Sequence, residues 1–426
     1  MKRSVTVCLG EGAIETGTLT FEAQGARRLA SFVYANTWLA HPARFALSPD
    51  LPLVSGHQYR ANQDAAQSAF FGCLADAEPD GWGRMVIARA HARQPAAQRK
   101  PATAGRPPLV PLNEVDYLLW VSDFCRAGAL RLRDAQGIFQ RPEDGGRGTP
   151  PLIALPDLLT ASRAIEENRE TARDLATLRG VGTSLGGLRP KCSIIDADGS
   201  LAIGKFPSVS DTRSIVYGEV LALKLAAKAG INAARARVVD SQGVPVAVIT
   251  RFDRVTDGTD GRPGRRLMYL SARSLLQAAP AEQHSYVDIA NAIRMHSSQA
   301  ALDLAELWRR MVFNVLINNV DDHLNNHGFL HHAHGQWKLA PAFDLNPFPD
   351  KERALKTWIS EDSGDAASLA EALHAAPLFG LSARAAQSVL HEVKTAVSRW
   401  KEVARSIAMT ARECARFAPA FAHPEL

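Results

Sequence analysis

The amino-acid sequence predicts an α+β protein with two lobes, in which a small strand-rich lobe precedes a larger, mostly α-helical C-terminal lobe. Three observations lead to this prediction. Short apolar runs joined by Gly-containing turns, which are typical of β-hairpins, occupy residues 191–249. Helical periodicity dominates after Phe252. A further unit of mixed strand and helix precedes them; it contains a Pro- and Gly-rich basic loop, residues 94–108, and is followed by a Pro- and Gly-rich linker, residues 133–151.

The linker at residues 133–151 separates the first predicted domain from the second. Residues 1–140 are expected to form an N-terminal mixed α/β subdomain, with a strand at Ser31–Tyr34. Residues 152–252 are expected to form the strand-rich lobe, and residues 253–426 the helical lobe. A chain of 426 residues has the length for two or three such domains.

The strand-rich lobe is predicted to contain a leading helix, a glycine-rich turn and two hairpins separated by a helix. That helix should end at Gly230, because glycine readily adopts the left-handed conformation of a helix C-terminus. In chain order these elements are residues 152–178, 180–187, 191–206, 217–229 and 237–249. The helical lobe is predicted to contain four helices, and the last and longest has Ser382 as its N-cap. They are residues 285–295, 302–317, 366–375 and 383–409.

Composition and charge are those of an ordinary globular protein, with 46% hydrophobic and 22% charged residues. The net charge of +5 is compatible with a phosphate-bearing ligand but too small and dispersed for dedicated DNA binding. The five cysteines form no CxxC pair, which favours free thiols over disulfides or a zinc site. The basic N-terminus lacks an apolar run, and no stretch approaches the roughly 20 apolar residues that span a bilayer. We therefore expect a cytoplasmic protein with no membrane partner.

Asp321 and Asn326 stand five positions apart in the segment Asn319–Asn326. This is the spacing of the base and the metal-binding amide in the catalytic loop of a protein kinase. Asp344 follows a short hairpin later, where a kinase places its second metal ligand. One carboxylate orients the attacking hydroxyl, while an amide and another carboxylate hold Mg²⁺. A capped helix end that runs into a turn would give the same letters, so this spacing alone is a weak signal.

A phosphate cradle and a strand lysine precede this segment, in the order that a kinase requires. The glycine-rich turn, Gly180–Gly187, allows backbone N–H groups to approach phosphate oxygens. Lys205 ends an apolar strand, and Glu219 on the next helix is placed to pair with it and orient its ammonium toward the phosphates of ATP. Each residue alone is more commonly a solvated surface group. Their shared order predicts a two-lobed, protein-kinase-like fold that uses ATP and Mg²⁺.

The segment Thr250–Arg254 lies where the two lobes are expected to join, and two interpretations of it remain open. In the first, its backbone hydrogen-bonds the adenine ring, and Thr250 and Phe252 belong to the nucleotide site. In the second, Phe252 is a core residue and Asp253 forms a local ion pair with Arg254.

Together these motifs resemble the HipA family of bacterial serine/threonine kinases, the toxin half of toxin–antitoxin pairs. Residues 184–191 are similar to the phosphate loop of the family, and residues 251–254 to its hinge. Residues 319–326 are similar to its catalytic loop, and residues 339–347 to its metal-binding segment. The first part of the chain is similar to its N-terminal subdomain, so the resemblance covers nearly the whole chain.

The resemblance implies a role for each matching residue. Asp321 would be the catalytic base. Ser184 would be phosphorylated by the enzyme itself, which would expel the loop and silence the activity. The magnesium ligands would be Asn326 and Asp344. One departure is Thr250, at a hinge position that is often acidic in the family. The implied ATP-binding residues are Leu185, Gly186, Gly187, Lys191, Lys205, Thr250, Phe252, His323 and Asn326.

The resemblance also implies the partners of the chain. A HipB-like helix-turn-helix antitoxin would hold the kinase in check and carry it to operator DNA, which the kinase alone would bind poorly. The phosphorylated protein would be an aminoacyl-tRNA synthetase or another translation factor.

Three other interpretations stay open at this point. A metal hydrolase is suggested by a histidine cluster, although a predicted turn at residues 333–335 would scatter it. An aminoglycoside-type small-molecule kinase also uses an aspartate–asparagine loop. The third is an inactive kinase fold that acts only as a corepressor scaffold. Such a scaffold should lack at least one of four active-site residues, and all four are present. The clustered histidines are His323, His327, His331, His332 and His334, and the four residues are Lys205, Asp321, Asn326 and Asp344.

Overall fold

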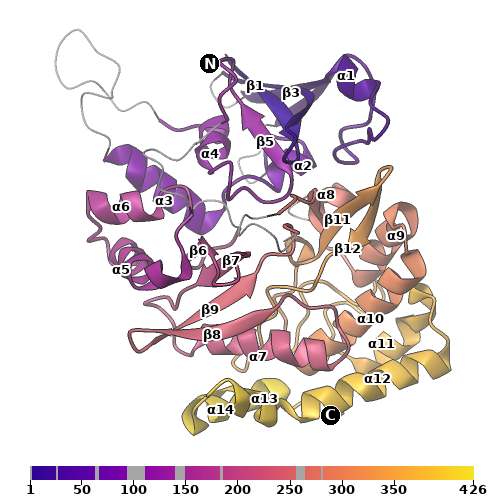
Figure 1. Ribbon diagram of the computed structural model, residues 1–426. Coiled ribbons are helices and arrows are strands. Elements are labelled where there is room, and N and C mark those ends of the chain that lie inside the picture. Colours follow the sequence, from indigo (N-terminus) through magenta and orange to yellow (C-terminus); the bar gives the residue numbers. More distant parts are fainter. Residues whose placement is uncertain are drawn as a thin grey trace.

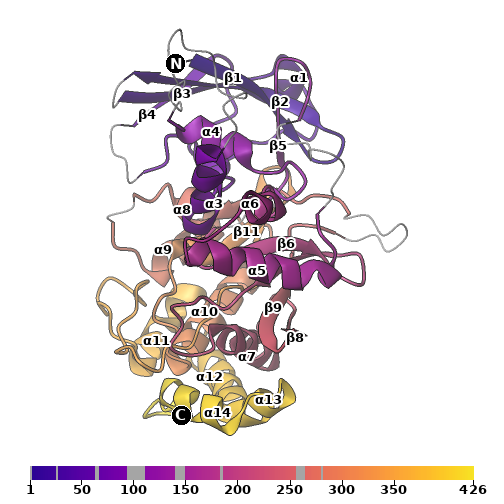
Figure 2. The ribbon, with the colours of Figure 1, turned by 90° about the vertical axis from the view of Figure 1, so that its left-hand side faces the viewer.

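The computed structural model of the chain describes residues 2–24, 27–62, 67–93, 111–139, 149–182, 186–255, 264–279 and 282–426. The elements form three tiers along the molecule (Figure 1). An N-terminal sheet lies at one end, a second sheet with its helices lies in the middle beside the larger helical lobe, and the C-terminal helices lie at the other end (Figure 2).

The N-terminal sheet has five strands in the order β4-β3-β2-β1-β5. Phe32 and Tyr34 alternate along β3 and are buried on one face, which is why the segment Ser31–Tyr34 is a strand as predicted. β5 returns from far along the chain to pair with β1, opposing Leu130 to Leu9. The elements of this unit are β1 (Lys2–Leu9), β2 (Ile14–Gln24), β3 (Arg27–Tyr34), α1 (Asn36–Leu39), β4 (His57–Asn62), α2 (Gly72–Ala75), α3 (Gly81–Ala92), α4 (Glu114–Trp120) and β5 (Leu130–Arg133).

The second sheet has four antiparallel strands in the order β6-β7-β9-β8. Its two predicted hairpins are confirmed. The predicted helix between them is also confirmed: Ser214 caps its start, and Gly230, with a φ of +77°, follows its end. The elements of this lobe are η2 (Leu152–Ala154), α5 (Leu155–Glu166), α6 (Ala172–Leu178), β6 (Lys191–Ile195), β7 (Leu201–Lys205), α7 (Ile215–Lys228), β8 (Ala236–Ser241) and β9 (Val244–Thr250).

The helical lobe is built around α10, whose Trp308 and Phe313 are fully buried. A small sheet in the order β10-β11-β12 lies beside this helix. Ser382 caps α12 as predicted, accepting a hydrogen bond from the backbone N–H of Ala385. The elements are β10 (Tyr269–Ser271), α8 (Ala272–Leu276), α9 (Tyr286–His296), α10 (Ala300–Leu316), η3 (Leu324–Asn326), β11 (Gly328–Ala333), β12 (Gln336–Leu339), α11 (Leu369–Ala375), η4 (Ala376–Phe379), α12 (Ala383–Ser398), α13 (Trp400–Ser406), α14 (Ala411–Phe417) and η5 (Ala418–Phe421).

Two predictions of continuous helices were wrong. The segment 152–178 is divided because Thr171 starts a new helix, with a capping box that pairs the side chains of Thr171 and Asp174 with each other's backbone N–H groups. The segment 383–409 is divided after Ser398, and Trp400 at the start of α13 stacks on Phe421 at a centroid distance of 4.6 Å. The first break has a local sequence signal, whereas the second accompanies a tertiary contact.

Helix α3 belongs to the N-terminal unit in sequence but packs on the second sheet. Trp82 shares a hydrophobic core with Leu155, Ile194 and Val248. Its indole N–H also donates to the carbonyl oxygen of Lys191 at 3.0 Å. The boundary near residue 140 and the division into three domains therefore stay predictions.

The described residues contain neither a disulfide bond nor a helix that is both long and apolar enough to cross a membrane. All five cysteines are free. Burial raises the pKa of the Cys73 and Cys192 thiols well above the usual value, so these two side chains are unreactive parts of the core.

Candidate active site

Lys205, the last residue of β7, makes charge-assisted hydrogen bonds to two carboxylates. Its Nζ lies 2.6 Å from Oε1 of Glu219 on α7 and 2.8 Å from Oδ1 of Asp344. Burial acts to lower the pKa of Lys205, but the two carboxylates outweigh burial and raise that pKa above its usual value. Two residues that the sequence predicts to pair are thus joined by a third, 139 positions away in the chain.

Asp344 is held in a left-handed backbone conformation, with a φ of +55°. An aspartate adopts this conformation more readily than most residues. Asn346 Nδ2 donates to the backbone oxygen of Asp344 at 3.2 Å and to its Oδ1 at 3.3 Å. Burial acts to raise the pKa of Asp344, but the charges of Lys205 and Lys191 outweigh it and hold that pKa well below the usual range. Asp344 is therefore a fixed anion.

A second lysine lies beside this ion pair, because Lys191 is the cross-strand neighbour of Lys205 in the pairing of β6 with β7. Its ammonium donates to the carbonyl oxygen of Gly186. Burial, together with repulsion from Lys205, lowers the pKa of Lys191 to about 8. Gly187 has a φ of +99°, a backbone conformation that other residues rarely adopt, and a Cβ there would lie 2.5 Å from the Lys191 Nζ, so a substitution would be strained and would displace the Lys191 ammonium. Ser184 and Leu185 lie outside the described residues.

The N-terminal unit reaches this glycine-rich turn through the start of α3. The backbone N–H of Gly187 donates to Oδ2 of Asp80 at 3.2 Å. The backbone N–H of Trp82 donates in return to the carbonyl oxygen of Gly187 at 3.0 Å. Both backbone groups of Gly187, at the end of the turn, are therefore hydrogen-bonded to the start of α3.

The segment that follows α10 is fixed by asparagine side chains. Asn319 Nδ2 donates to Oδ1 of Asn314 at 3.1 Å, and its Oδ1 accepts from the backbone N–H of Asn346 at 3.3 Å. These bonds tie the predicted catalytic loop to the Asp344 segment. The Asp321 side chain is 48% exposed, and its Oδ1 lies 3.2 Å from the Nζ of Lys356. Asn326, at the end of η3, is buried.

Asp322, next to Asp321, is the centre of a buried network that sequence reasoning missed. Its Oδ2 accepts from the hydroxyl of Tyr286, from Nδ2 of Asn314 at 3.0 Å and from Nε2 of His327 at 2.8 Å. Burial acts to raise the pKa of Asp322, but His327 outweighs it and the pKa is lowered. The network anchors the loop at Asp322, the buried neighbour of Asp321. The unused sequence signal is Asn314, a polar residue among the apolar neighbours of α10.

The five histidines named above do not assemble into one site. His327 is bound to Asp322, whereas His331 stacks on Phe45 at a centroid distance of 3.7 Å. His332 and His334 are exposed on the β11–β12 hairpin, and His323 lies before η3. In the described ranges, no group of three or more His, Cys, Asp or Glu side chains could hold a metal ion. The geometry therefore gives no support to the metal-hydrolase interpretation.

Asp253 forms the predicted ion pair, and this pair is part of a larger buried cluster. Its Oδ2 lies 2.6 Å from Nη2 of Arg251 and 2.8 Å from Nη1 of Arg254. The same oxygen accepts from the backbone N–H of Gly128 at 2.8 Å. The two guanidinium groups also donate to the carbonyl oxygens of residues 124–126 and 128. The hinge segment is thereby fastened to the N-terminal unit.

Thr250 and Phe252 flank this cluster. The backbone N–H of Thr250 donates to the carbonyl oxygen of Arg235 at 2.9 Å, so that group is already used inside the sheet. Phe252 is partly buried, with its ring centroid 5.4 Å from that of Phe343 and 6.3 Å from that of Tyr269. A contact of either residue with adenine stays a prediction.

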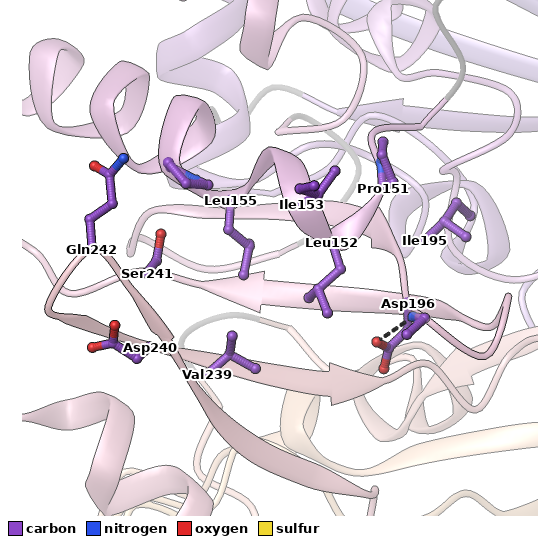
Figure 3. A pocket seen from close by; sticks show the side chains of 12 residues that line it. Pro151, Leu152, Ile153, Leu155, Ile195, Asp196, Val239, Asp240, Ser241 and Gln242 are labelled. Atoms are coloured by element: carbon purple, nitrogen blue, oxygen red, sulfur yellow. Dashed lines mark hydrogen bonds between the residues drawn. The ribbon is translucent and has the colours of Figure 1, made fainter.

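A pocket of about 520 Å³ lies between η2, α5 and the ends of β6 and β8, and Figure 3 shows the side chains that line it. Leu152, Leu155, Ile195 and Val239 give it a mainly apolar lining. None of the predicted site residues lines it, so it is separate from the site around Lys205.

Two family models match the chain. The model of the HipA-like C-terminal domain matches residues 183–400, just over half of the chain, and the model of the HipA N-terminal domain matches residues 6–101. The chain belongs to the HipA family. The Lys205 ion pair, the glycine-rich turn from residue 183 and the Asp321 loop all lie within the first match.

The chain is also similar to two curated relatives and to a solved structure. The chain is 27% identical over 192 residues to "Putative kinase Y4mE" of Sinorhizobium fredii and to "Putative kinase" of Haemophilus influenzae. Each match covers 40% of this chain, and 44% and 54% of the two relatives, so it spans about half of their length.

The solved structure is that of the Shewanella oneidensis MR-1 HipA in a toxin–antitoxin complex with HipB and its operator DNA. It aligns with a TM-score of 0.67 at 16% identity and covers 98% of this chain and 96% of that one. The HipA-family chain therefore has the predicted two-lobed, α+β, protein-kinase-like fold.

Proposed function

We propose that this HipA-family chain is an ATP- and Mg²⁺-dependent kinase that phosphorylates serine or threonine of a protein. The observation that carries the proposal is the ion pair of Lys205 with both Glu219 and Asp344, formed next to a fixed loop that presents Asp321. Phosphoryl transfer depends on positioning and on neutralising charge, and this arrangement supplies a fixed cation, a fixed anion and a half-exposed carboxylate.

The donor atoms fit the proposed ligands. A carboxylate and an amide, Asp344 and Asn326, are the hard oxygen donors that Mg²⁺ prefers, and the bound ion would neutralise the phosphates. Lys205 and Lys191 would bind phosphate oxygens, with backbone N–H groups of the glycine-rich turn. Among the described residues, the buried Nδ1 of His323 has no hydrogen-bond partner, which suits it to a nucleotide contact. Asp321 would accept the proton of the attacking hydroxyl.

The proposal is tested by incubating the purified chain with γ-labelled ATP, with and without Mg²⁺, in the presence of candidate proteins and, separately, of aminoglycosides. We expect label on serine or threonine of a protein, and no transfer after chelation of Mg²⁺. Label on an aminoglycoside alone would favour the small-molecule kinase. ATP binding without any transfer would favour the inactive corepressor scaffold.

Lys205→Ala and Asp344→Asn should both weaken binding of a non-hydrolysable ATP analogue with Mg²⁺. Losing one charge-assisted contact costs roughly 1.5–3 kcal/mol, which corresponds to about 10- to 100-fold in affinity. Titration calorimetry measures the effect. Lys401→Ala, which removes an exposed lysine on α13, is the matched control and should bind like wild type. Wild-type affinity in both site variants would place the nucleotide elsewhere.

Nucleotide affinity should fall as the pH rises through about 8, where the ammonium of Lys191 loses its proton. Below this pH the charged ammonium attracts phosphate, and above it the amine is neutral. Between pH 7 and pH 9 the loss should be no more than about tenfold, since a single proton is involved. Lys191→Arg, which stays charged, should remove this pH dependence. A wild-type dissociation constant that is constant across this range would contradict the assignment.

Ser184 should become phosphorylated by the chain itself. A phosphate of about −1.5 to −2 charge in the glycine-rich turn would compete with the phosphates of ATP for the same N–H groups and lysines, so activity should fall. Mass spectrometry after incubation with Mg-ATP locates the phosphate, with Ser184→Ala as the control. Phosphate on other residues only, or full activity of the Ser184-phosphorylated form, would contradict this regulation.

The proposed partner is a HipB-like helix-turn-helix antitoxin that restrains the kinase and carries it onto operator DNA. The support is the fold shared with the HipA of the HipB–operator complex and the N-terminal unit, which transfer chemistry does not require. The proposed substrate is a translation factor such as an aminoacyl-tRNA synthetase. Co-expression with the product of the neighbouring gene, followed by size-exclusion chromatography, tests the antitoxin.

A further inference from the structure

The segment Leu355–Trp358 is bound to the backbone on both sides of Asp321. The backbone N–H of Lys356 donates to the carbonyl oxygen of Val320 at 3.2 Å. The hydroxyl of the next residue, Thr357, donates to the carbonyl oxygen of Asp322 at 2.8 Å. These two bonds flank Asp321, so the position of Lys356 is fixed relative to the proposed base.

The same segment is anchored away from the site. The backbone N–H of Trp358 donates to the carbonyl oxygen of His284 at 3.0 Å. The carbonyl oxygen of Trp358 accepts from the backbone N–H of Tyr286 at 2.8 Å. Tyr286 in turn donates its hydroxyl to Asp322. Thr357 is 3% exposed, whereas the Lys356 side chain is 56% exposed. The buried Thr357 and its hydrogen bonds thus hold the neighbouring Lys356 in place. The Nζ of Lys356 is accessible to solvent and lies 3.2 Å from Oδ1 of Asp321.

The stability of the fold does not explain this cation. Both partners of the Lys356–Asp321 pair are about half exposed, and such pairs contribute little because water and salt screen them. The other two lysines of the site are committed elsewhere. Lys205, on β7, binds Glu219 and Asp344. Lys191, on the neighbouring strand β6, binds the carbonyl oxygen of Gly186. Neither is described in contact with Asp321, where charge moves during transfer.

We propose that Lys356 is a catalytic residue whose ammonium binds the transferring phosphoryl group beside Asp321. This inference rests on the proposed kinase function and adds a residue that the motifs do not predict. The substrate hydroxyl oxygen attacks the γ-phosphorus, and the bond from that phosphorus to the bridging oxygen breaks. Its electron pair leaves with ADP, and the hydroxyl proton passes to the carboxylate of Asp321. Lys356 reduces the repulsion between that carboxylate and the phosphoryl oxygens, and stabilises the charge on them in the transition state.

The test compares Lys356→Met, Lys356→Arg and the control Lys351→Met in steady-state transfer assays. Lys351 is exposed five residues before Lys356, with its ammonium 3.8 Å from the Phe348 ring, and its substitution makes the same change in net charge. For Lys356→Met we expect a fall in kcat of about 10- to 100-fold, as for one lost charge-assisted contact. The KM for ATP and the thermal midpoint should stay near those of wild type. Lys356→Arg should recover part of the rate, and Lys351→Met should behave as wild type.

Chemical rescue provides a second measurement. In Lys356→Ala protein, added ethylammonium should restore part of the lost rate in a saturable manner, which a purely structural role would not allow. An active wild type with equal kcat in Lys356→Met would overturn this inference and leave the kinase proposal standing. A lowered thermal midpoint shared by Lys356→Met and Lys356→Arg, without rescue, would also overturn it. A wild type that transfers no phosphate would overturn the proposed function, and this inference with it.

Discussion

Asp321→Asn protein should transfer phosphate about 10²–10⁴-fold more slowly than wild type while binding ATP with unchanged affinity. The carboxylate that accepts the hydroxyl proton is replaced by an amide of the same shape that cannot accept it. The fold should persist, because the half-exposed Asp321–Lys356 pair contributes less than about 1 kcal/mol. Single-turnover transfer assays measure the rate, and titration calorimetry measures the affinity.

The matched control is Asp362→Asn, which removes an exposed carboxylate elsewhere in the helical lobe and should leave both quantities unchanged. Undiminished transfer in Asp321→Asn protein would refute the assignment of the base. A joint loss of transfer and of ATP affinity would mean that Asp321 acts in nucleotide binding instead.

Asp253→Asn should lower the free energy of unfolding by about 3–5 kcal/mol, the usual cost of breaking a buried ion pair. The substitution leaves Arg251 and Arg254, which are 5% and 7% exposed, without their shared counter-ion. It also weakens the acceptor for the backbone N–H of Gly128. Urea denaturation measures the loss, and hydrogen exchange at residues 124–128 should accelerate because the N-terminal unit loses its attachment to the hinge.

The control for this prediction is Asp350→Asn, since Asp350 pairs with Arg213 but is 60% exposed, and the loss should stay below about 1 kcal/mol. The pH dependence supplies a further check. Burial acts to raise the pKa of Asp253, but the two arginines hold it well below the ordinary value of 3.8. The stabilisation is therefore present above about pH 4 and is lost as the pH falls below it, and this component should be missing from Asp253→Asn. Equal losses in the two variants would contradict the role of the buried cluster.

The sequence order of the motifs predicted that Lys205 at the end of β7 pairs with Glu219 on α7, and the two side chains are in contact. Lys205 and Asp344 are 139 positions apart, yet their ammonium and carboxylate groups lie in contact. The predicted partner of Lys205 was Glu219 on the next helix, and the further contact with Asp344 was not predicted. The hairpins and the helix between them follow from turn glycines and apolar runs that act over a few residues.

The parts that could not be predicted depend on contacts between distant segments. Asp322 and Asp321 are adjacent and chemically alike, but only the packing of α9 and α10 decides which carboxylate is buried and which remains accessible. The position of Lys356 beside Asp321 depends on two hydrogen bonds to the loop, one from its own backbone N–H and one from the Thr357 hydroxyl. Likewise, nothing local to Trp82 indicates that its ring joins the core of the second sheet.

The attachment of Arg254 to the carbonyl oxygen of Gly128 also has a consequence for biosynthesis. The two residues are 126 positions apart, so at about 5–20 residues per second the ribosome adds the arginine on the order of ten seconds after the glycine. β5 can complete the N-terminal sheet during that interval, because its partner β1 has already been made. The carbonyl oxygens of residues 124–126 and 128, just before β5, must meanwhile remain hydrated. The nascent chain therefore passes through a period in which its first unit is folded but the surface that will meet the hinge is open to chaperones and to other chains.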